Sequence, residues 1–203
     1  VYYISGKAGC ISHCVPDYNR IINEGADAII KEAKEKEKQL PPNKKKEIAF
    51  YQSVQIALKG LISYAENISK EATRLAITEK DSERRKNLKA IASVCANIPA
   101  KPARNFREAV NSLWLAQVGI HAENINMAMS PGRLDQVLYP FYKKDKEENK
   151  ITGEEALNLC CCLFLKIADN TNLVPEAAEK LWGGAGSTPA VTLGGIDKDG
   201  NDA

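Results

Sequence analysis

The residues from Ser130 to Gln136 have the types and spacing best suited to chemistry. They read Ser-Pro-Gly-Arg-Leu-Asp-Gln, so a rigid Pro-Gly turn leads into a helix that carries an arginine and an aspartate. Charged side chains at the start of a helix suit the polar wall of a cavity better than a core, and loops carry function disproportionately. A structural interpretation stays open, in which Ser130 caps the helix while Arg133 and Asp135 pair with neighbours.

Two histidines and six cysteines are the other candidate reactive groups. His13 lies in a loop between Cys10 and Cys14, but this trio lacks the fourth ligand of a zinc site, so we predict no metal. His121 lies on a mixed helix face and is predicted to be structural. The run 160–162 lies within a helical pattern, where packing is favoured over a catalytic thiol because mid-helix positions do not stabilise a thiolate.

The composition excludes several classes of protein. Of 203 residues, 44% are hydrophobic and 27% charged, which is ordinary for a globular protein, and the net charge of +2 argues against a nucleic-acid role. No apolar run approaches the ~20 residues of a membrane helix, and no leader peptide is evident, so a cytoplasmic protein is expected. Both ends read as cut within strands or turns, so we expect a fragment.

Apolar periodicity predicts a mainly helical chain with short strands near its ends. The expected helices cover 16–40, 47–77, 82–97 and 105–124, a short helix that ends near Tyr139, and one from Thr152. A charged loop is expected at 143–150, and strands at 1–4 and 190–193. Asp81 or Ser82 is predicted to cap the third helix, and Thr152 with Glu155 forms a capping-box pattern.

Five segments, taken in order, resemble the pyruvate formate-lyase-type domain of the glycyl radical enzymes over nearly all of the chain. They are His13-Cys-Val-Pro-Asp-Tyr, Glu83-Arg-Arg-Lys-Asn-Leu, Pro102-Ala-Arg-Asn-Phe-Arg-Glu-Ala with Trp114, Gly132-Arg-Leu-Asp-Gln, and Leu193-Gly-Gly. The resemblance implies a helix-rich α/β fold, a sector of a ten-stranded α/β barrel. Residues 1–203 would be part of a single domain of this type, truncated at both ends.

The same resemblance implies a glycyl radical lyase as the full-length parent. The catalytic Cys and Glu and the radical Gly are expected outside this chain, which would then hold no catalytic residue and no bound cofactor. A radical-SAM activating enzyme would install the radical, and the full-length protein would be a homodimer acting on a small molecule. Substrate contacts are expected from His13, Ser130 and Ser187, with Tyr3 as an aromatic wall.

The expected reaction is dehydration, by C–O cleavage, of a small hydroxylated substrate such as glycerol, a diol or hydroxyproline. Arylacetate decarboxylation, or another C–C, C–N or C–S cleavage of the same family, is the alternative. Two other classes stay open from the residues alone. One is a helical interaction module built on the amphipathic helix at 47–77, and the other is a thiol- or iron-binding redox protein built on the cysteines.

Overall fold

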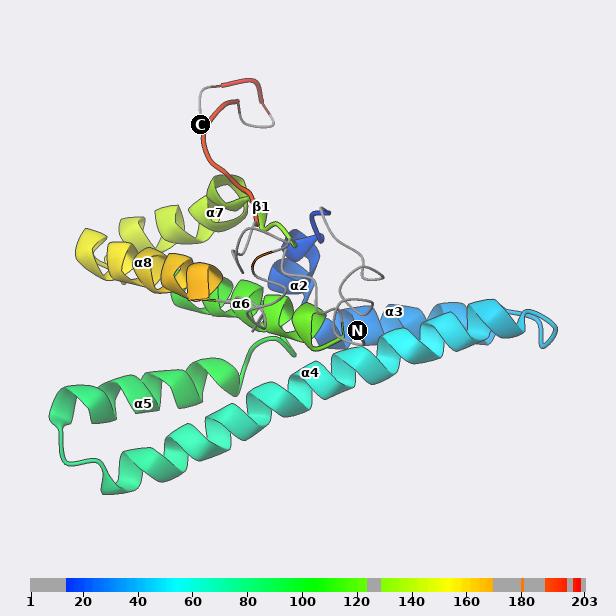
Figure 1. Ribbon diagram of the computed structural model, residues 1–203, viewed down its shortest axis with the longest axis horizontal. Helices are drawn as coiled ribbons and strands as arrows, with labels where there is room; N and C mark the ends of the chain where they lie inside the picture. Colours follow the sequence, from blue (N-terminus) through cyan, green and yellow to red (C-terminus); the bar gives the residue numbers. More distant parts are fainter. Residues whose placement is uncertain (1–13, 124–128, 170–179, 181–188, 197–198, 202–203) are drawn as a thin grey trace. The chain divides into compact units, whose positions relative to one another are not determined.

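The computed structural model describes residues 14–123, 129–169, 180, 189–196 and 199–201 (Figure 1). Tyr3, His13, Ser187 and the strand expected at 1–4 lie outside these residues. The chain divides into two compact units, one of residues 19–116 and one of residues 1–18 with 117–203. No helix of the described part is long and apolar enough to cross a membrane.

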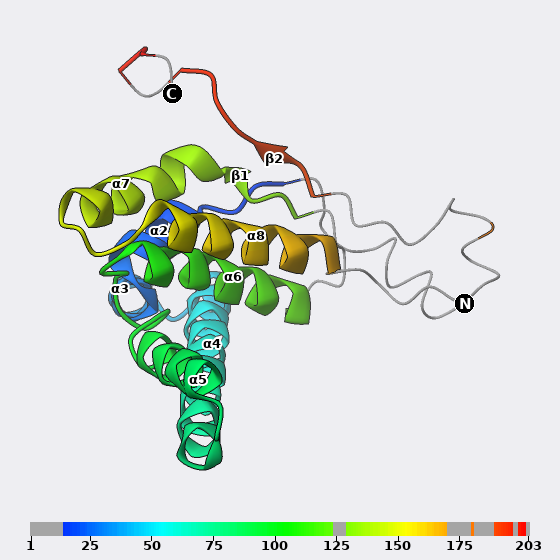
Figure 2. The same cartoon turned by 90° about the vertical axis from the view of Figure 1, so that its left-hand side faces the viewer.

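The unit of residues 19–116 is built from helices. Its longest helix pairs with the next one as a hairpin, and the two lie side by side in both views (Figures 1 and 2). The helices are α2 (Tyr18–Glu24), α3 (Ala26–Gln39), α4 (Lys45–Thr78), α5 (Ser82–Cys95) and α6 (Phe106–Glu123). The unit begins within α2 and ends within α6.

The predicted apolar face of α4 forms part of the core of this unit. Ala65 is 1% exposed and packs in a cluster with Val94, Cys95, Ile98 and Leu115. Helix α4 also packs against α3, so part of the face that suggested a helical interaction module is covered within the unit. Burial of this apolar surface, rather than helix propensity alone, stabilises so long a helix.

The single helix expected at 16–40 is wrong, because Gly25 divides it into α2 and α3. Gly25 adopts φ 78°, a left-handed conformation that interrupts a helix. The turn at 98–103 binds to the backbone at this break between the two helices. The Ala26 amide donates to the Pro99 carbonyl at 2.7 Å, and the Ala103 amide donates to the Ile22 carbonyl at 2.8 Å. The break therefore creates a docking point for a distant turn.

Both predicted helix caps are confirmed. The Asp81 carboxylate accepts a hydrogen bond from the Arg84 amide at 2.7 Å, at the start of α5. At the start of α8 (Gly153–Asp169), the Glu155 amide donates to the Thr152 hydroxyl at 3.1 Å while the Thr152 amide donates to the Glu155 carboxylate at 2.9 Å. These reciprocal bonds satisfy amides that have no partner within the helix.

The other unit carries two short strands, β1 (Gly132–Arg133) and β2 (Val191–Thr192), which pair in parallel. A parallel bridge also joins Cys14 to Met129, so the segment 129–133 pairs with two partners distant in sequence. Helices α7 (Leu134–Glu147) and α8 connect β1 to β2 (Figure 2). The helix-rich α/β class is thus confirmed, with the parallel pairing that a barrel sector requires.

Helix α7 is longer than expected, because it continues through Pro140. The sequence predicted an end near Tyr139 and a charged loop at 143–150. Tyr139 is 57% exposed and Pro140 is exposed, so water can satisfy the carbonyl that the proline ring leaves without an N–H partner. Lys144 and Lys146 in the last turn complement the negative end of the helix dipole.

Candidate functional site

Ser130 is the sequence-predicted site residue that the structure describes, and three backbone segments meet at it. Its amide donates to the Cys14 carbonyl at 3.1 Å, and its Oγ accepts a hydrogen bond from the Ala190 amide at 2.9 Å. A hydroxyl has two lone pairs and one hydrogen. With one lone pair taken by Ala190, and no described residue accepting its hydrogen, the half-buried hydroxyl can act as a donor.

The alternative in which Ser130 caps the following helix is wrong. Helix α7 begins at Leu134, and its N-cap position is Arg133, which makes no side-chain cap hydrogen bond. The serine side chain instead bonds to the segment that leads into β2. Ser130 therefore lies just before β1 and is bonded to the segment that precedes β2.

Arg133, Asp135 and Gln136 hold the segment that follows β2. The Asp135 carboxylate accepts from the Gly194 amide at 2.9 Å and from the Arg133 guanidinium at 3.2 Å. Arg133 Nη1 and Gln136 Nε2 both donate to the Ile196 carbonyl, at 3.3 and 2.9 Å. The structural interpretation of Arg133 and Asp135 is therefore correct, whereas the Ser130 hydroxyl keeps a hydrogen for which no described residue is the acceptor.

The pKa of Asp135 makes the strength of these contacts to residues 194–196, here called the clamp, dependent on pH. Desolvation opposes ionisation, but hydrogen bonds from Arg133 and from the Gln136 and Gly194 amides outweigh it, so the pKa lies below its ordinary value. A carboxyl with a lowered folded-state pKa stabilises the fold above the ordinary value of about 3.9, and this contribution is lost as the pH falls through the folded-state pKa. The clamp should therefore loosen in acid.

We expect the Gly194 amide to exchange with solvent faster, after correction for intrinsic exchange, once the pH falls through the folded-state pKa of Asp135, which lies below the ordinary value of about 3.9. The reason is that protonated Asp135 is a weaker acceptor. Hydrogen-exchange mass spectrometry of residues 190–196 measures this. Asp135→Asn is the matched variant, since it keeps the shape but removes the titration. An identical acid response in Asp135→Asn would contradict the assignment.

A buried polar junction lies behind Ser130. Gln117, 4% exposed, accepts a hydrogen bond from the Tyr18 hydroxyl and donates through Nε2 to the Met129 carbonyl at 3.0 Å. The same Nε2 lies 2.8 Å from His121 Nε2. Burial, with a smaller effect of the Cys14 thiol, raises the pKa of Tyr18, so its hydroxyl remains a protonated donor.

His121 fits the structural role expected for it, and Gln117 was missed as a site residue. Burial lowers the pKa of His121, which favours a neutral ring beside the Gln117 amide. A polar side chain at an inward position is itself a signal, because a buried amide requires partners.

The cysteines divide into buried and exposed groups. The described cysteines are free thiols: Cys95 is buried, Cys14 and Cys160 are half-buried, and Cys161 and Cys162 are exposed. The prediction that the cysteines at 160–162 pack in the interior is therefore wrong for Cys161 and Cys162, within the part of the chain that the structure describes. Desolvation, together with the neighbouring Cys161, raises the pKa of Cys160, so that thiol is not an activated nucleophile.

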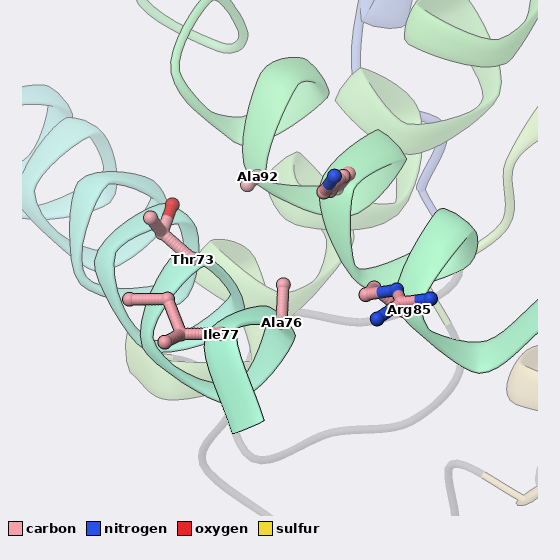
Figure 3. Close-up of a pocket in the computed structure, with 6 residues that line it drawn as sticks. Thr73, Ala76, Ile77, Arg85 and Ala92 are labelled. Carbon is pink, nitrogen blue, oxygen red and sulfur yellow. The ribbon is translucent and has the colours of Figure 1, made fainter. Parts of the chain in front are cut away.

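A surface hollow between α4 and α5 is a weaker candidate (Figure 3). Thr73, Ala76 and Ile77 line it from α4, and Arg85, Lys89 and Ala92 line it from α5. Ile77 is 78% exposed, and the two basic side chains are also exposed. No buried polar group points into it, so it lacks the convergent groups that fix a ligand.

A family model described as pyruvate formate lyase-like matches residues 5–203. The chain belongs to this family. The resemblance found in the five sequence segments is thereby confirmed, and one family model covers both compact units.

The relatives are glycyl radical enzymes several times longer than this chain. An isethionate sulfite-lyase of Nitratidesulfovibrio vulgaris is 34% identical over 195 residues, which is 93% of this chain and 24% of the relative. A structure on 1,2-propanediol dehydration in Roseburia inulinivorans matches with TM-score 0.88 and 31% identity, over 95% of this chain and 25% of that one. A glycyl radical enzyme from Archaeoglobus fulgidus matches with TM-score 0.85 and 34% identity, over 100% of this chain and 27% of that one. The chain thus spans about a quarter of their length.

Proposed function

We propose that this chain is part of a glycyl radical lyase that dehydrates a small hydroxylated substrate such as a diol, glycerol or hydroxyproline. The observation that carries the proposal is the Ser130 hydroxyl, held by the Ala190 amide and left able to donate. Family membership and the likeness to a structure on 1,2-propanediol dehydration support it.

Ser130 suits substrate binding because its geometry is set before any ligand arrives. The Cys14 carbonyl holds its amide and the Ala190 amide holds its oxygen, so little rotamer freedom is left to lose on binding. The remaining O–H can donate to a substrate hydroxyl or acid oxygen. In our proposal it orients the substrate and does not transfer a proton.

The proposed partners of Ser130 in the pocket are His13, Ser187 and Tyr3. Sequence proximity supports the first two, because His13 directly precedes Cys14 and Ser187 lies three residues before Ala190. Cys14 and Ala190 are the two residues that hydrogen-bond to Ser130. We therefore propose that an imidazole and a second hydroxyl bind further oxygens of the substrate.

The radical chemistry belongs, in this proposal, to residues beyond this chain. A radical-SAM activating enzyme would install the glycyl radical, which would pass to the catalytic Cys for hydrogen-atom abstraction from the substrate. The residues of this chain bind and orient the substrate and help to exclude water from a closed site. We also propose that the full-length protein is a cytoplasmic homodimer.

Ser130→Ala in the full-length, anaerobically activated enzyme should raise KM by roughly fivefold, the usual effect of losing one neutral hydrogen bond. The radical should still form, because Ser130 does not belong to the radical machinery. Turnover kinetics measures the first expectation, and electron paramagnetic resonance measures the second.

Ser53→Ala is the matched control, since Ser53 is an exposed serine of α4 whose hydroxyl donates to the Ala49 carbonyl. Unchanged KM in Ser130→Ala, for every substrate that the enzyme turns over, would remove Ser130 from the pocket. Absence of any radical signal in the wild-type protein would remove the proposed reaction class.

Cleavage of a C–S bond is the second candidate, favoured by the 34% identity to an isethionate sulfite-lyase. A sulfonate oxygen would accept the same Ser130 hydrogen bond as a substrate hydroxyl. Anaerobic assays that compare 1,2-propanediol, glycerol, hydroxyproline and isethionate distinguish the two, because dehydration yields a carbonyl product or an imine and the second reaction yields sulfite.

A further inference from the structure

We propose that Gln117 is a positioning residue that sets the orientation of the Ser130 hydroxyl through the Met129–Ser130 peptide. This inference rests on the proposed function of Ser130 in substrate binding. It assigns to a buried helix residue an effect on substrate affinity, although its amide contacts the strand backbone and not the Ser130 side chain.

Both polar atoms of the Gln117 amide have partners. Its carbonyl oxygen accepts from Tyr18, and its two N–H groups are directed at the Met129 carbonyl and the His121 ring nitrogen. A flipped amide would place oxygen against the Met129 carbonyl and N–H groups against the Tyr18 hydroxyl. The network therefore selects one orientation of the side chain, and burial makes a lost partner costly.

The peptide between Met129 and Ser130 is held at both of its polar ends. Gln117 binds its carbonyl at 3.0 Å, and the Cys14 carbonyl receives its N–H at 3.1 Å. Because a peptide unit is planar, these two bonds fix its rotation about the strand axis. That rotation sets the direction of the Ser130 side chain, which then meets the Ala190 amide at 2.9 Å.

A double-mutant cycle separates positioning from a general effect on stability. Gln117→Met keeps the approximate size of the side chain and removes every hydrogen bond of the amide. If Gln117 acts through Ser130, Gln117→Met and Ser130→Ala should each raise KM by roughly fivefold, and the double variant should be no worse than either alone. The measurement uses the full-length activated enzyme with its best substrate.

Hydrogen exchange of residues 129–133 gives a second readout that needs no turnover. The Ser130 amide should exchange at least several-fold faster in Gln117→Met, because the peptide has lost one of its two anchors. Gln136→Met is the matched control: it removes a glutamine bond of 2.9 Å to the Ile196 carbonyl and should leave Ser130 exchange unchanged.

Independent, multiplying effects of the two substitutions on KM would overturn the inference, as would unchanged exchange at Ser130. If Gln117→Met loses its cooperative unfolding transition, Gln117→Glu replaces it, because it keeps the shape and the acceptor for Tyr18 but puts oxygen in place of the donor to Met129. A wild-type enzyme without activity would refute the proposed function alone, and the exchange measurement would still decide whether Gln117 anchors the strand.

Discussion

Replacing Glu108 with alanine is expected to lower the free energy of unfolding by about 3 kcal/mol, since several hydrogen bonds to a buried carboxylate and side-chain packing are lost together. Glu108 is 1% exposed. Its carboxylate accepts from the Arg104 amide at 2.8 Å, from Arg104 Nε at 3.0 Å and from Asn97 Nδ2 at 3.0 Å. One side chain thus ties the turn after α5 to the first turn of α6, and its removal takes away the acceptor that these donors share.

Thermal or denaturant unfolding measures the loss, and Glu71→Ala is the matched control. Glu71 also makes a bidentate pair with an arginine, Arg74, at 2.8 and 2.7 Å, but both side chains are more than half exposed. Exposed pairs contribute about 0–1 kcal/mol, so this variant should be close to wild type. Equal losses in the two variants would show that burial of Glu108 is not the cause.

Gly25→Ala should be at least as damaging, with an expected loss of about 3 kcal/mol or more from backbone strain and steric overlap. The residue has φ 78°, which side chains other than glycine adopt at a cost. A β-carbon there would lie 2.6 Å from the Ala100 carbonyl oxygen and 2.6 Å from the Lys101 carbonyl carbon. Both are backbone atoms, so the turn at 98–103 would have to move away.

Gly60→Ala provides the opposite expectation in a neighbouring helix. A β-carbon at Gly60, within α4, meets nothing within 4 Å, so the substitution should stabilise the protein by up to about 1 kcal/mol through helix propensity. Chemical denaturation compares the two variants directly. If Gly25→Ala left the free energy of unfolding unchanged, the turn at 98–103 could not be packed tightly against the break between α2 and α3.

Local sequence signals predicted the helices well where periodicity and caps agree. The apolar spacing in 47–77 predicted α4, and the caps at Asp81 and Thr152 predicted where α5 and α8 begin. These signals are local, because each depends on residues within a few turns of one another. Gly25 and Pro140 were misinterpreted because their effects depend on a distant turn and on exposure to solvent.

The site shows the same division between local and distant information. The residue types marked Ser130 as a candidate, but its hydrogen bonds to Cys14 and Ala190 join positions far apart in sequence. Arg133 and Asp135 have equally suggestive types, yet they hold the backbone at Gly194 and Ile196. Side-chain chemistry alone does not distinguish a donor presented to a ligand from one used to hold a neighbouring segment.

The distances in sequence that separate the partners of the 129–133 segment have a consequence during synthesis on the ribosome. The α4–α5 hairpin can close once residue 95 has emerged, because its contacts are local. Met129 pairs with Cys14, 115 residues earlier, whereas Ser130 can bind the Ala190 amide only after a further 60 residues have been synthesised. Contacts of such long range form slowly, and an incompletely paired strand is prone to join another chain. Nascent chains that stall between these points should therefore be the species that depends most on chaperones.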